Sequence, residues 1–491
     1  MIELSTVEKK GIDQLWSQLS LEGRSDDAGP FSQLTLILLL RKYENDEKGG
    51  VSELWRNMLL YSKDRYTPHH SVSQFLNKVL KDLSEDYAQE FNNLFRFLLA
   101  GEISPTFAHI FTEFESLFTQ ILLNHDFYAA YELTFKYLLE KRRDEQYKNR
   151  ERIDSPPHIA RFLVELLHPE MTDSVLDPAC GQGGFLLAVK DFQLAQQLPE
   201  DYKTIDPDGF EQVKHQTKGL NEITGKLDLN GIDVNQTTSQ IAWLNLFFNN
   251  IPYFTIDSKD SIELAEEELQ ARDIIMCQPP FGVKSNFALS PLYPVETKSG
   301  DLLFLQQVLL RLKPGGKAAI ILPRGTISSG VKAYAETKKL LVAGEYQLEA
   351  VISLPRAIFS PGTSMETSIL LIKRLERDET RQEKVWFYQL KDDGYSKDRY
   401  RRKLKTTPLP EAVTAWHNRE SNTKQTDRKG NHFFVPVAEI IKADMDLSFS
   451  RYQEFEYEQI DYEPTDKILR KLKDLEEDIK VEMENLNKLY R

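Results

Sequence analysis

Apolar residues in the first 145 positions recur at the three- and four-residue spacing of amphipathic helices. Examples are the runs Phe31-Leu34-Leu36-Leu39-Leu40, Phe91-Leu94-Phe95-Phe97-Leu98 and Phe107-Ile110-Phe111-Phe114-Phe118. Gly and Pro are sparse here, and no alternating strand pattern is sustained. The pattern predicts an N-terminal helical domain over residues 1–145, folded as a bundle. The charged segment Glu140–Glu145 predicts a linker at its end.

From residue 146 to about residue 395, short apolar runs alternate with helical segments. The predicted strands share a content of β-branched or aliphatic residues and lie at 174–176, 231–234, 273–276, 317–322, 348–352 and 368–372. Helical patterns at 238–249 and 302–312 lie between them. This alternation predicts βαβ units and a doubly wound α/β sheet. In such sheets ligands bind beyond the carboxyl ends of the strands.

The chain becomes polar and irregular after about residue 385, and we treat residues 396–491 as a C-terminal region. A basic cluster there comprises Lys397, Arg399, Arg401, Arg402, Lys403 and Lys405, which suits either phosphate contacts or a solvated hairpin. The last apolar stripe steps by four and three residues and predicts a helix: Ile468, Leu472, Leu475, Ile479, Met483, Leu486 and Tyr490. An isolated helix cannot bury such a stripe, so we expect packing on a partner or on this chain's own N-terminal bundle.

Composition and charge limit the classes of protein to which this chain can belong. The 491 residues suggest about two to four domains, and the longest apolar run, around Leu36–Leu40, is too short to cross a bilayer. The segment that starts at Met1–Leu4 has neither the basic nor the apolar region of a secretory signal, so we expect none. Two cysteines, Cys180 and Cys277, fit neither a disulfide framework nor a zinc site, so we expect no metal and a reducing cytoplasm. The formal charge of −14 implies either that DNA is not the substrate or that another chain makes most of the contacts to DNA.

A glycine-rich segment, DPACGQGGFL at Asp177–Leu186, follows the first predicted strand and opens a helix. Its glycines let the backbone approach a ligand closely. The spacing is not the G-x-G-x-x-G of dinucleotide-binding folds. Asp233, at the next predicted strand end, is placed to accept hydrogen bonds from ribose hydroxyls. Together these features favour a nucleoside cofactor over a turn that serves only the fold.

A second segment, DIIMCQPPFG at Asp273–Gly282, is an apolar strand that runs into a Pro-Pro turn. The prolines fix the backbone and hold Gln278 at the sheet's carboxyl edge. The exocyclic amine of adenine is a poor nucleophile. Hydrogen-bond acceptors at Gln278 and nearby backbone carbonyls can hold this amine and direct its lone pair toward an incoming methyl group. Phe281 can stack on a base flipped out of a duplex. The structural alternative is a Pro-Pro loop that merely ends a strand.

The two segments together resemble the motifs of N6-adenine DNA methyltransferases, and most closely those of the modification subunits of type I restriction–modification systems. The family's first motif typically reads DPACGTGGFL, which differs from this chain only at Gln182. Residues 312–319, 322–325, 352–367 and 447–452 also follow the family's patterns. The resemblance covers nearly the whole chain. It implies a Rossmann-like fold and a site-specific enzyme that transfers a methyl group from S-adenosylmethionine (SAM) to adenine N6 in double-stranded DNA.

The resemblance also implies roles for particular residues. The methionine end of SAM would be lined by Gly181, Gln182, Gly183 and Gly184, with Asp177 nearby. Asp233 would hold the ribose, and Asp260 would approach the cofactor's adenine. The upstream cofactor motif corresponds to Asp154, Ser155 and Pro156. The catalytic loop corresponds to Gln278, Pro279, Pro280 and Phe281.

Two residues depart from the family pattern. Asp154 stands where an aromatic residue is usual, which weakens the match of the upstream cofactor motif. Gln278 stands where the family usually has Asn, and its extra methylene displaces the acceptor by roughly an ångström, which costs about a hundredfold in rate if uncorrected. We expect a working enzyme whose local backbone compensates. The alternative is a catalytically impaired scaffold subunit of a phage-defence complex.

No sizeable segment is suited to reading base edges, so the resemblance implies a separate specificity subunit that reads the DNA sequence. Two modification subunits are expected for each specificity subunit, and the presence of a nuclease subunit stays open. We expect no membrane partner. The other enzymatic alternative is a methyltransferase acting on a protein or a small molecule, because a Pro-Pro-aromatic loop also serves those acceptors.

Overall fold

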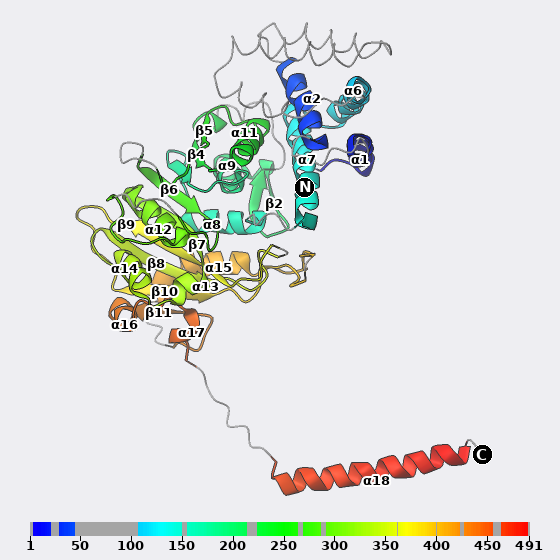
Figure 1. The fold of residues 1–491 in the computed structure, drawn as a ribbon, viewed down its shortest axis with the longest axis vertical. Coiled ribbons are helices and arrows are strands. Elements are labelled where there is room, and N and C mark those ends of the chain that lie inside the picture. Colours follow the sequence, from blue (N-terminus) through cyan, green and yellow to red (C-terminus); the bar gives the residue numbers. More distant parts are fainter. Residues whose placement is uncertain are drawn as a thin grey trace. The chain divides into compact units, whose positions relative to one another are not determined.

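The computed structural model describes residues 3–20, 29–44, 107–149, 155–213, 223–263, 269–285, 291–360, 362–398, 400–422, 427–454 and 463–489. The chain divides into two compact units, Met1–Tyr452 and Gln453–Arg491 (Figure 1). The helical pattern predicted around Phe91 lies outside the described residues, as does Asp154.

The described N-terminal residues form helices that share one apolar core. They are α1 (Thr6–Ser20), α2 (Pro30–Glu44), α6 (Phe107–Asn124) and α7 (Phe127–Asn149). Ile37, Phe118 and Phe135 are fully buried in this core. The predicted linker at Glu140–Glu145 is instead the last part of α7. Its charged side chains hold α7 against α1, because Trp16 Nε1 donates to Glu145 at 2.8 Å and Lys141 Nζ donates to Asp13 at 2.6 Å.

A nine-stranded sheet lies in the first unit, in the order β11-β10-β8-β9-β7-β6-β1-β4-β5, among the residues described. Its strands are β1 (Ser174–Asp177), β4 (Asp228–Ile232), β5 (Phe254–Asp257), β6 (Arg272–Cys277), β7 (Leu312–Pro323), β8 (Tyr346–Ser353), β9 (Thr367–Arg374), β10 (Lys384–Gln389) and β11 (His432–Pro436). The neighbours from β5 to β7 pair in parallel, whereas β9 is antiparallel to both β7 and β8. The doubly wound α/β sheet predicted from the sequence is confirmed.

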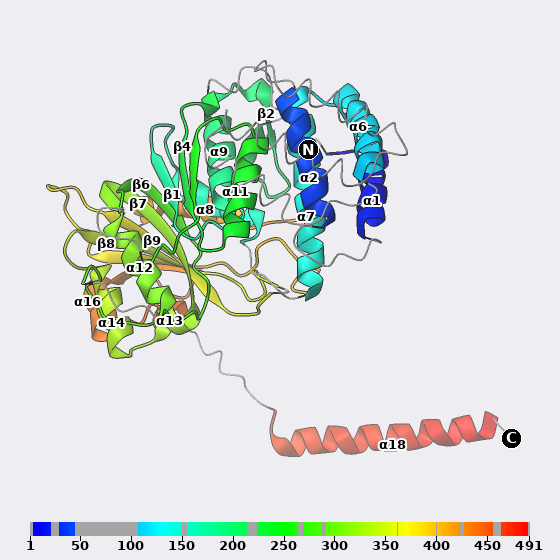
Figure 2. The same ribbon diagram turned by 45° about the horizontal axis from the view of Figure 1, so that its top comes forward.

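Helices cover both faces of this sheet (Figure 2). One core contains residues of α8 (Pro157–Leu167), α9 (Gly184–Gln197) and α15 (Leu409–His417). The opposite core contains residues of α12 (Gly300–Leu310), α13 (Arg324–Ser328), α16 (Val437–Lys442) and α17 (Phe449–Tyr452). Strand residues alternate between the two, as Val175 and Leu176 do on β1. The other short elements are α14 (Lys332–Leu340), η1 (Glu200–Tyr202), η3 (Arg419–Asn422), and the hairpin of β2 (Lys203–Ile205) and β3 (Glu211–Val213).

The region after residue 385 was predicted to be irregular, and this prediction is wrong for β10, α15 and β11. β10 pairs in parallel with β8 and in antiparallel with β11. Its Val385, Trp386 and Phe387 are buried. β10 is a short strand within a polar stretch and shows no sustained alternation, so its burial depends on β8 and β11 on either side of it.

Helix α11 (Gln236–Phe248) belongs to both the bundle and the sheet. Ile241, Leu244 and Phe248 are part of the bundle core. Leu246 is part of the core on one face of the sheet. Lys42 of α2 adds a polar contact at the end of α11, donating to the Phe247 carbonyl at 2.8 Å. The helical bundle is therefore anchored to the sheet through α11.

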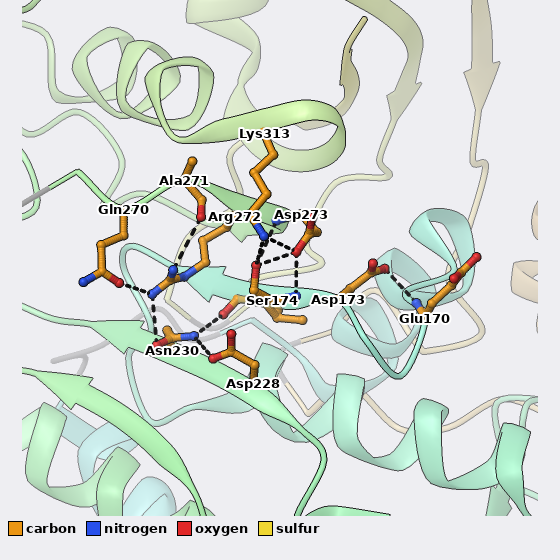
Figure 3. A network of polar contacts seen from close by, with 11 residues as sticks. Glu170, Asp173, Ser174, Asp228, Asn230, Gln270, Ala271, Arg272, Asp273 and Lys313 are labelled. Atoms are coloured by element: carbon orange, nitrogen blue, oxygen red, sulfur yellow. Dashed lines mark hydrogen bonds and ion pairs between the residues drawn. The ribbon is translucent and has the colours of Figure 1, made fainter. Parts of the chain in front are cut away.

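A polar network at the amino edge of the sheet ties neighbouring strands together (Figure 3). Asp273 of β6 accepts hydrogen bonds from Ser174 N at 2.9 Å, from Ser174 Oγ at 2.6 Å and from Lys313 Nζ at 2.7 Å. Arg272 donates to Asn230 of β4 at 3.2 Å. Partial burial raises the pKa of Asp273, but the hydrogen bonds from Lys313 and Ser174 outweigh it and hold the pKa below its ordinary value.

Asp273→Asn is expected to lower the free energy of unfolding at about pH 7 by about 1–2 kcal/mol, because it loses charge-assisted hydrogen bonds at a partly exposed site. A lowered carboxyl pKa stabilises the fold above the unfolded-state value of about 4, and this contribution is lost as the pH falls through the folded-state value. Urea unfolding at about pH 7 and pH 3 should therefore show a smaller acid-induced loss in the variant than in the wild type. The exposed Asp378→Asn serves as control. Equal acid sensitivity of wild type and Asp273→Asn would contradict the assignment.

The second unit contains helix α18 (Thr465–Leu489), so the C-terminal helix predicted from the apolar stripe is confirmed. The stripe residues from Ile468 to Leu486 are exposed along it. No helix in the described residues is both long enough and apolar enough to span a membrane.

Candidate active site

The carboxyl ends of β6, β1, β4 and β5 border one cavity of about 1010 Å³. Most of the site residues predicted from the sequence line it: Ser155, Asp177, Gly181, Gln182, Gly184, Asp233, Asp260, Gln278, Pro279, Pro280 and Phe281. Neither Pro156 nor Gly183 is among the lining residues. The structure thus brings the glycine-rich loop and the Pro-Pro loop to one cavity, and the roles of the individual residues stay predictions.

The glycine-rich loop uses its glycines for different purposes. Gly183 has a φ of +82°, and a Cβ there would lie 2.8 Å from Leu246 Cδ1 on α11, so this position requires glycine for the turn and for close packing. A Cβ at Gly184 would meet no atom within 4 Å, although Gly184 lines the cavity. The open space at Gly184 is therefore available to a ligand.

Asn245 on α11 holds the backbone of this loop and is itself contacted by Asn249, the residue after the helix. Asn245 Nδ2 donates to the Gln182 carbonyl at 2.9 Å, and Asn249 Nδ2 donates to the Asn245 carbonyl at 2.8 Å. Lys190 of α9, only 1% exposed, donates to Asn249 Oδ1 at 3.2 Å. Burial lowers the pKa of Lys190, but the negative charges of Glu132 on α7 and of Asp191 outweigh it and raise the pKa. The loop is thus linked to a buried ammonium group next to the helical bundle.

Three carboxylates lie at consecutive strand ends. Asp233 accepts from Gly181 N at 3.1 Å and from Asn235 N at 2.8 Å. Asp260 accepts from Ile262 N at 2.9 Å. Asp177 accepts from Ala179 N at 3.0 Å, and burial raises its pKa well above the ordinary value, with the Asp233 charge acting in the same direction. The cavity therefore presents oriented acceptors to ligand hydroxyl and amine groups.

The Pro-Pro loop is held from several sides. The Ser155 hydroxyl donates to Gln278 Oε1. Asp301 accepts from the Gly282 backbone and from Thr326 Oγ1, the latter at 2.9 Å. Phe281 and Phe359 meet edge to face, with ring centroids 5.5 Å apart. Gln278 and Phe281 consequently have defined orientations at the cavity wall.

Sequence reasoning missed another wall of the cavity. His158 Nε2 lies 2.9 Å from Asp393 Oδ2, and its ring stacks on Tyr395 at a centroid distance of 4.1 Å. His158 and Tyr395 both line the cavity. The positions of His158 and Asp393 are 235 residues apart, so no local pattern reports their contact.

The basic cluster near residue 400 contributes to this wall. Arg401 contacts Asp393, and Lys403 contacts Asp208. Tyr395 and Lys403 form an antiparallel bridge, as a hairpin would. These contacts engage Arg401 and Lys403 within the protein, whereas Arg399 lies outside the described residues.

Cys180 and Cys277 follow β1 and end β6 respectively, and β1 and β6 are neighbours. Neither cysteine forms a disulfide, and both are buried. Burial raises the pKa of Cys277 well above its ordinary value, and the Asp177 charge acts in the same direction. These surroundings oppose thiolate formation, and we assign the cysteines no catalytic role. No cluster of three or more potential metal-binding side chains occurs in the part of the chain that the structure describes.

Comparison with known proteins decides the family. A family model described as "N-6 DNA Methylase" matches residues 124–461. The chain belongs to the N-6 DNA methylase family. The family and the fold predicted from the sequence are both confirmed.

Individual relatives agree with this assignment. The chain is 28% identical over 318 residues to the EcoEI type I restriction enzyme methylase subunit of Escherichia coli, covering 63% of this chain and 59% of that protein. A chain from a study of the assembly and conformational transition of a type I R-M system has a TM-score of 0.68 at 18% identity, covering 99% of both chains. A modification subunit of a putative type I restriction enzyme from Vibrio vulnificus YJ016 has a TM-score of 0.65 at 17% identity, covering 89% of this chain and 94% of that chain. These two structures show the same fold.

SAM is the cofactor of this family, as predicted. The cavity suits it on two counts. The open space at Gly184 admits a ligand beside the glycine-rich loop. Asp233 and Asp260 present acceptors at the ends of β4 and β5, as a ribose and an adenine require. The residues present therefore fit the cofactor.

Proposed function

We propose that this chain is the modification subunit of a type I restriction–modification system and methylates adenine N6 in double-stranded DNA. The observation that supports it most is one cavity lined both by the glycine-rich loop after β1 and by Gln278 to Phe281 after β6. β1 and β6 are neighbouring strands, so a methyl donor on the first loop lies beside an acceptor on the second. Family membership supports the same chemistry.

In this proposal Asp233 holds the ribose of SAM, Asp260 faces its adenine, and the loop from Gly181 to Gly184 receives its methionine part. When bound, SAM supplies an electrophilic methyl group on a sulfonium. Gln278 Oε1 and the Pro279 carbonyl accept hydrogen bonds from the target amine, which directs its lone pair toward that methyl group. Phe281 stacks on the flipped base. Transfer of this methyl group would break the S–C bond as the N–C bond to the amine forms, and the amine proton would pass to solvent.

The contact between Ser155 and Gln278 accounts for the unusual glutamine. The longer side chain has one more rotatable bond than asparagine, and the Ser155 hydroxyl fixes its amide oxygen by a hydrogen bond. A carbonyl oxygen has a second lone pair, which stays available to the target amine. We therefore infer that Ser155 positions Gln278, in place of the compensation by the backbone alone that the sequence suggested.

Ser155→Ala is expected to lower kcat roughly tenfold at saturating SAM when residue 278 is Gln, because the amide loses its orientation. In a Gln278→Asn background the same change should alter kcat less than about twofold, because the shorter side chain does not need the hydroxyl. Steady-state kinetics of the four proteins gives the coupling between the positions, and Ser329→Ala, outside the cavity, is the control. Equal effects of Ser155→Ala in both backgrounds would show that Ser155 does not act through Gln278.

Methyl transfer tests the proposed function directly. The chain, co-purified with its specificity subunit, is given tritium-labelled SAM and duplex DNA containing the cognate site. We expect label in the DNA. A wild-type protein that incorporates none, but gains activity through Gln278→Asn, would establish the impaired-scaffold alternative instead. Label in a co-purifying protein rather than in DNA would establish a protein methyltransferase.

The proposed partners are duplex DNA and a specificity subunit, with two copies of this chain for each specificity subunit. The net charge of −14 supports a complex in which another chain provides much of the DNA affinity. The apolar stripe of α18 supports a helical docking segment, because a single amphipathic helix leaves such a stripe uncovered. A nuclease subunit and a cytoplasmic location stay predictions, as does the division into domains at residues 1–145, 146–395 and 396–491.

Deletion of residues 464–491 is expected to abolish co-purification with the specificity subunit while leaving SAM affinity within about twofold, because the cavity belongs to the other unit. Size-exclusion chromatography of the co-expressed proteins measures the first effect and calorimetry the second. Leu472→Asp with Ile479→Asp, which leaves the chain length unchanged, should give the same result. An intact complex after deletion would instead support packing of the helix on this chain's own bundle.

A further inference from the structure

Three charged residues meet at the carboxyl edge of the sheet, outside the predicted site. Arg324 directly follows β7, Arg356 follows β8, and Glu366 directly precedes β9. The strand order β8-β9-β7 places these ends side by side. Arg324 and Arg356 each contact a different oxygen of the Glu366 carboxylate. The Arg324 backbone also donates to the Glu366 carbonyl at 2.8 Å. We call these three residues the rim cluster.

The rim cluster belongs to the surroundings of the Pro-Pro loop. The segment from Arg356 to Glu366 carries Phe359, whose ring lies 5.5 Å from that of Phe281. The same segment carries Gly362, which lines the cavity. β7, which leads into Arg324, pairs with β6, which leads into Gln278. The cluster therefore closes the base of a loop that touches the proposed base-stacking residue.

The arginines of the rim cluster are largely open to solvent. The exposed fraction of the side chain is 56% for Arg324, 73% for Arg356 and 27% for Glu366. A single carboxylate between two guanidinium groups leaves a net positive charge at this edge. Each guanidinium has five N–H donors and uses only part of them on Glu366. Exposed ion pairs of this kind contribute little to stability. Holding the two ends of the loop together, which we call stapling the loop, therefore does not by itself require two solvent-facing arginines.

We propose that Arg324 and Arg356 bind phosphates of the DNA strand next to the target adenine, where each still has N–H donors not engaged by Glu366. The proposal rests on the proposed function, since it assumes that DNA enters the cavity beside Phe281. Guanidinium groups match phosphate oxygens through paired hydrogen bonds. Phosphate contacts position a duplex without reading its sequence, which suits a subunit that leaves sequence recognition to a partner.

The test measures binding of a fluorescein-labelled duplex of about 30 base pairs by the complex of this chain with its specificity subunit, across a series of salt concentrations. Arg324→Gln and Arg356→Gln are each expected to weaken binding about 3- to 10-fold near 0.15 M salt and to reduce the slope of log K against log salt by about one per lost contact. Lys442→Gln, which removes one exposed positive charge on α16 after the amino-edge end of β11, should change neither quantity.

Glu366→Gln separates phosphate binding from loop stapling because the two roles predict opposite results. If the arginines bind phosphate, loss of the competing carboxylate leaves DNA affinity unchanged or increases it. If the cluster only staples the loop, Glu366→Gln weakens DNA binding as much as either arginine variant does, with an unchanged salt slope, and this outcome overturns the proposal. Normal DNA binding by both arginine variants also overturns it. A wild-type complex that transfers no methyl group to DNA would overturn the proposed function, whatever the variants do.

Discussion

Gln278→Ala is expected to lower kcat for methyl transfer to DNA by roughly 10²- to 10³-fold, the cost of removing one preorganised hydrogen-bonding group from a developing charge. The target amine would lose the acceptor that directs its lone pair toward the methyl group. The affinity for SAM should stay within about twofold, because the cofactor contacts come from the ends of other strands.

Single-turnover measurement of methyl transfer, combined with calorimetry of SAM binding, separates these two effects. The matched control is Gln197→Ala, which removes an exposed glutamine at the end of α9. A Gln278→Ala protein that retains kcat within about threefold of the wild type would place the catalytic acceptor elsewhere.

Gly184→Ala is expected to weaken SAM binding at least tenfold, or by about 1.4 kcal/mol, while leaving the fold intact or slightly more stable. The added methyl group would meet no protein atom within 4 Å, so it costs nothing in the free protein and occupies space that the ligand needs. An alanine also has less conformational freedom in the unfolded chain than a glycine has. Calorimetry measures the affinity, and thermal unfolding without ligand measures the stability.

Two other glycines serve as controls for this result. Gly183→Ala should destabilise the fold itself, because a φ of +82° strains an alanine and its Cβ would lie 2.8 Å from Leu246 Cδ1. Gly325→Ala, which also adds a methyl group to open space in a helix but lies outside the cavity, should leave SAM affinity unchanged. Unchanged SAM affinity in Gly184→Ala would mean that the cofactor does not approach this part of the loop.

Local patterns were enough to predict the parts of the site that depend on backbone geometry. The turn at Gly181 to Gly184 and the Pro-Pro turn after Gln278 each follow an apolar strand, and the carboxyl ends of parallel strands share one edge. Placing both turns on one cavity therefore required only that β1 and β6 lie in the same parallel sheet. The strands and helices with sustained apolar periodicity, such as β7 and α11, were predictable for the same reason.

Contacts between distant residues could not be predicted in this way. Ser155 and Gln278 are 123 positions apart, and His158 and Asp393 are 235 apart, so their pairing depends on the finished fold. The prediction of a linker was wrong because its charged residues make tertiary contacts. Glu145 and Lys141 suggested a linker by composition, yet they bind α1. β10 was missed because its burial comes from its neighbours β8 and β11.

The most direct test of the central claim is to identify the methylated base. DNA incubated with SAM and the wild-type complex is digested to nucleosides and analysed by mass spectrometry. We expect N6-methyladenine as the new product, at a level that falls with Gln278→Ala and with Gly184→Ala. A methylated cytosine, or no methylated nucleoside despite bound SAM and bound DNA, would contradict a cavity in which the glycine-rich loop and the Pro-Pro loop act on adenine together.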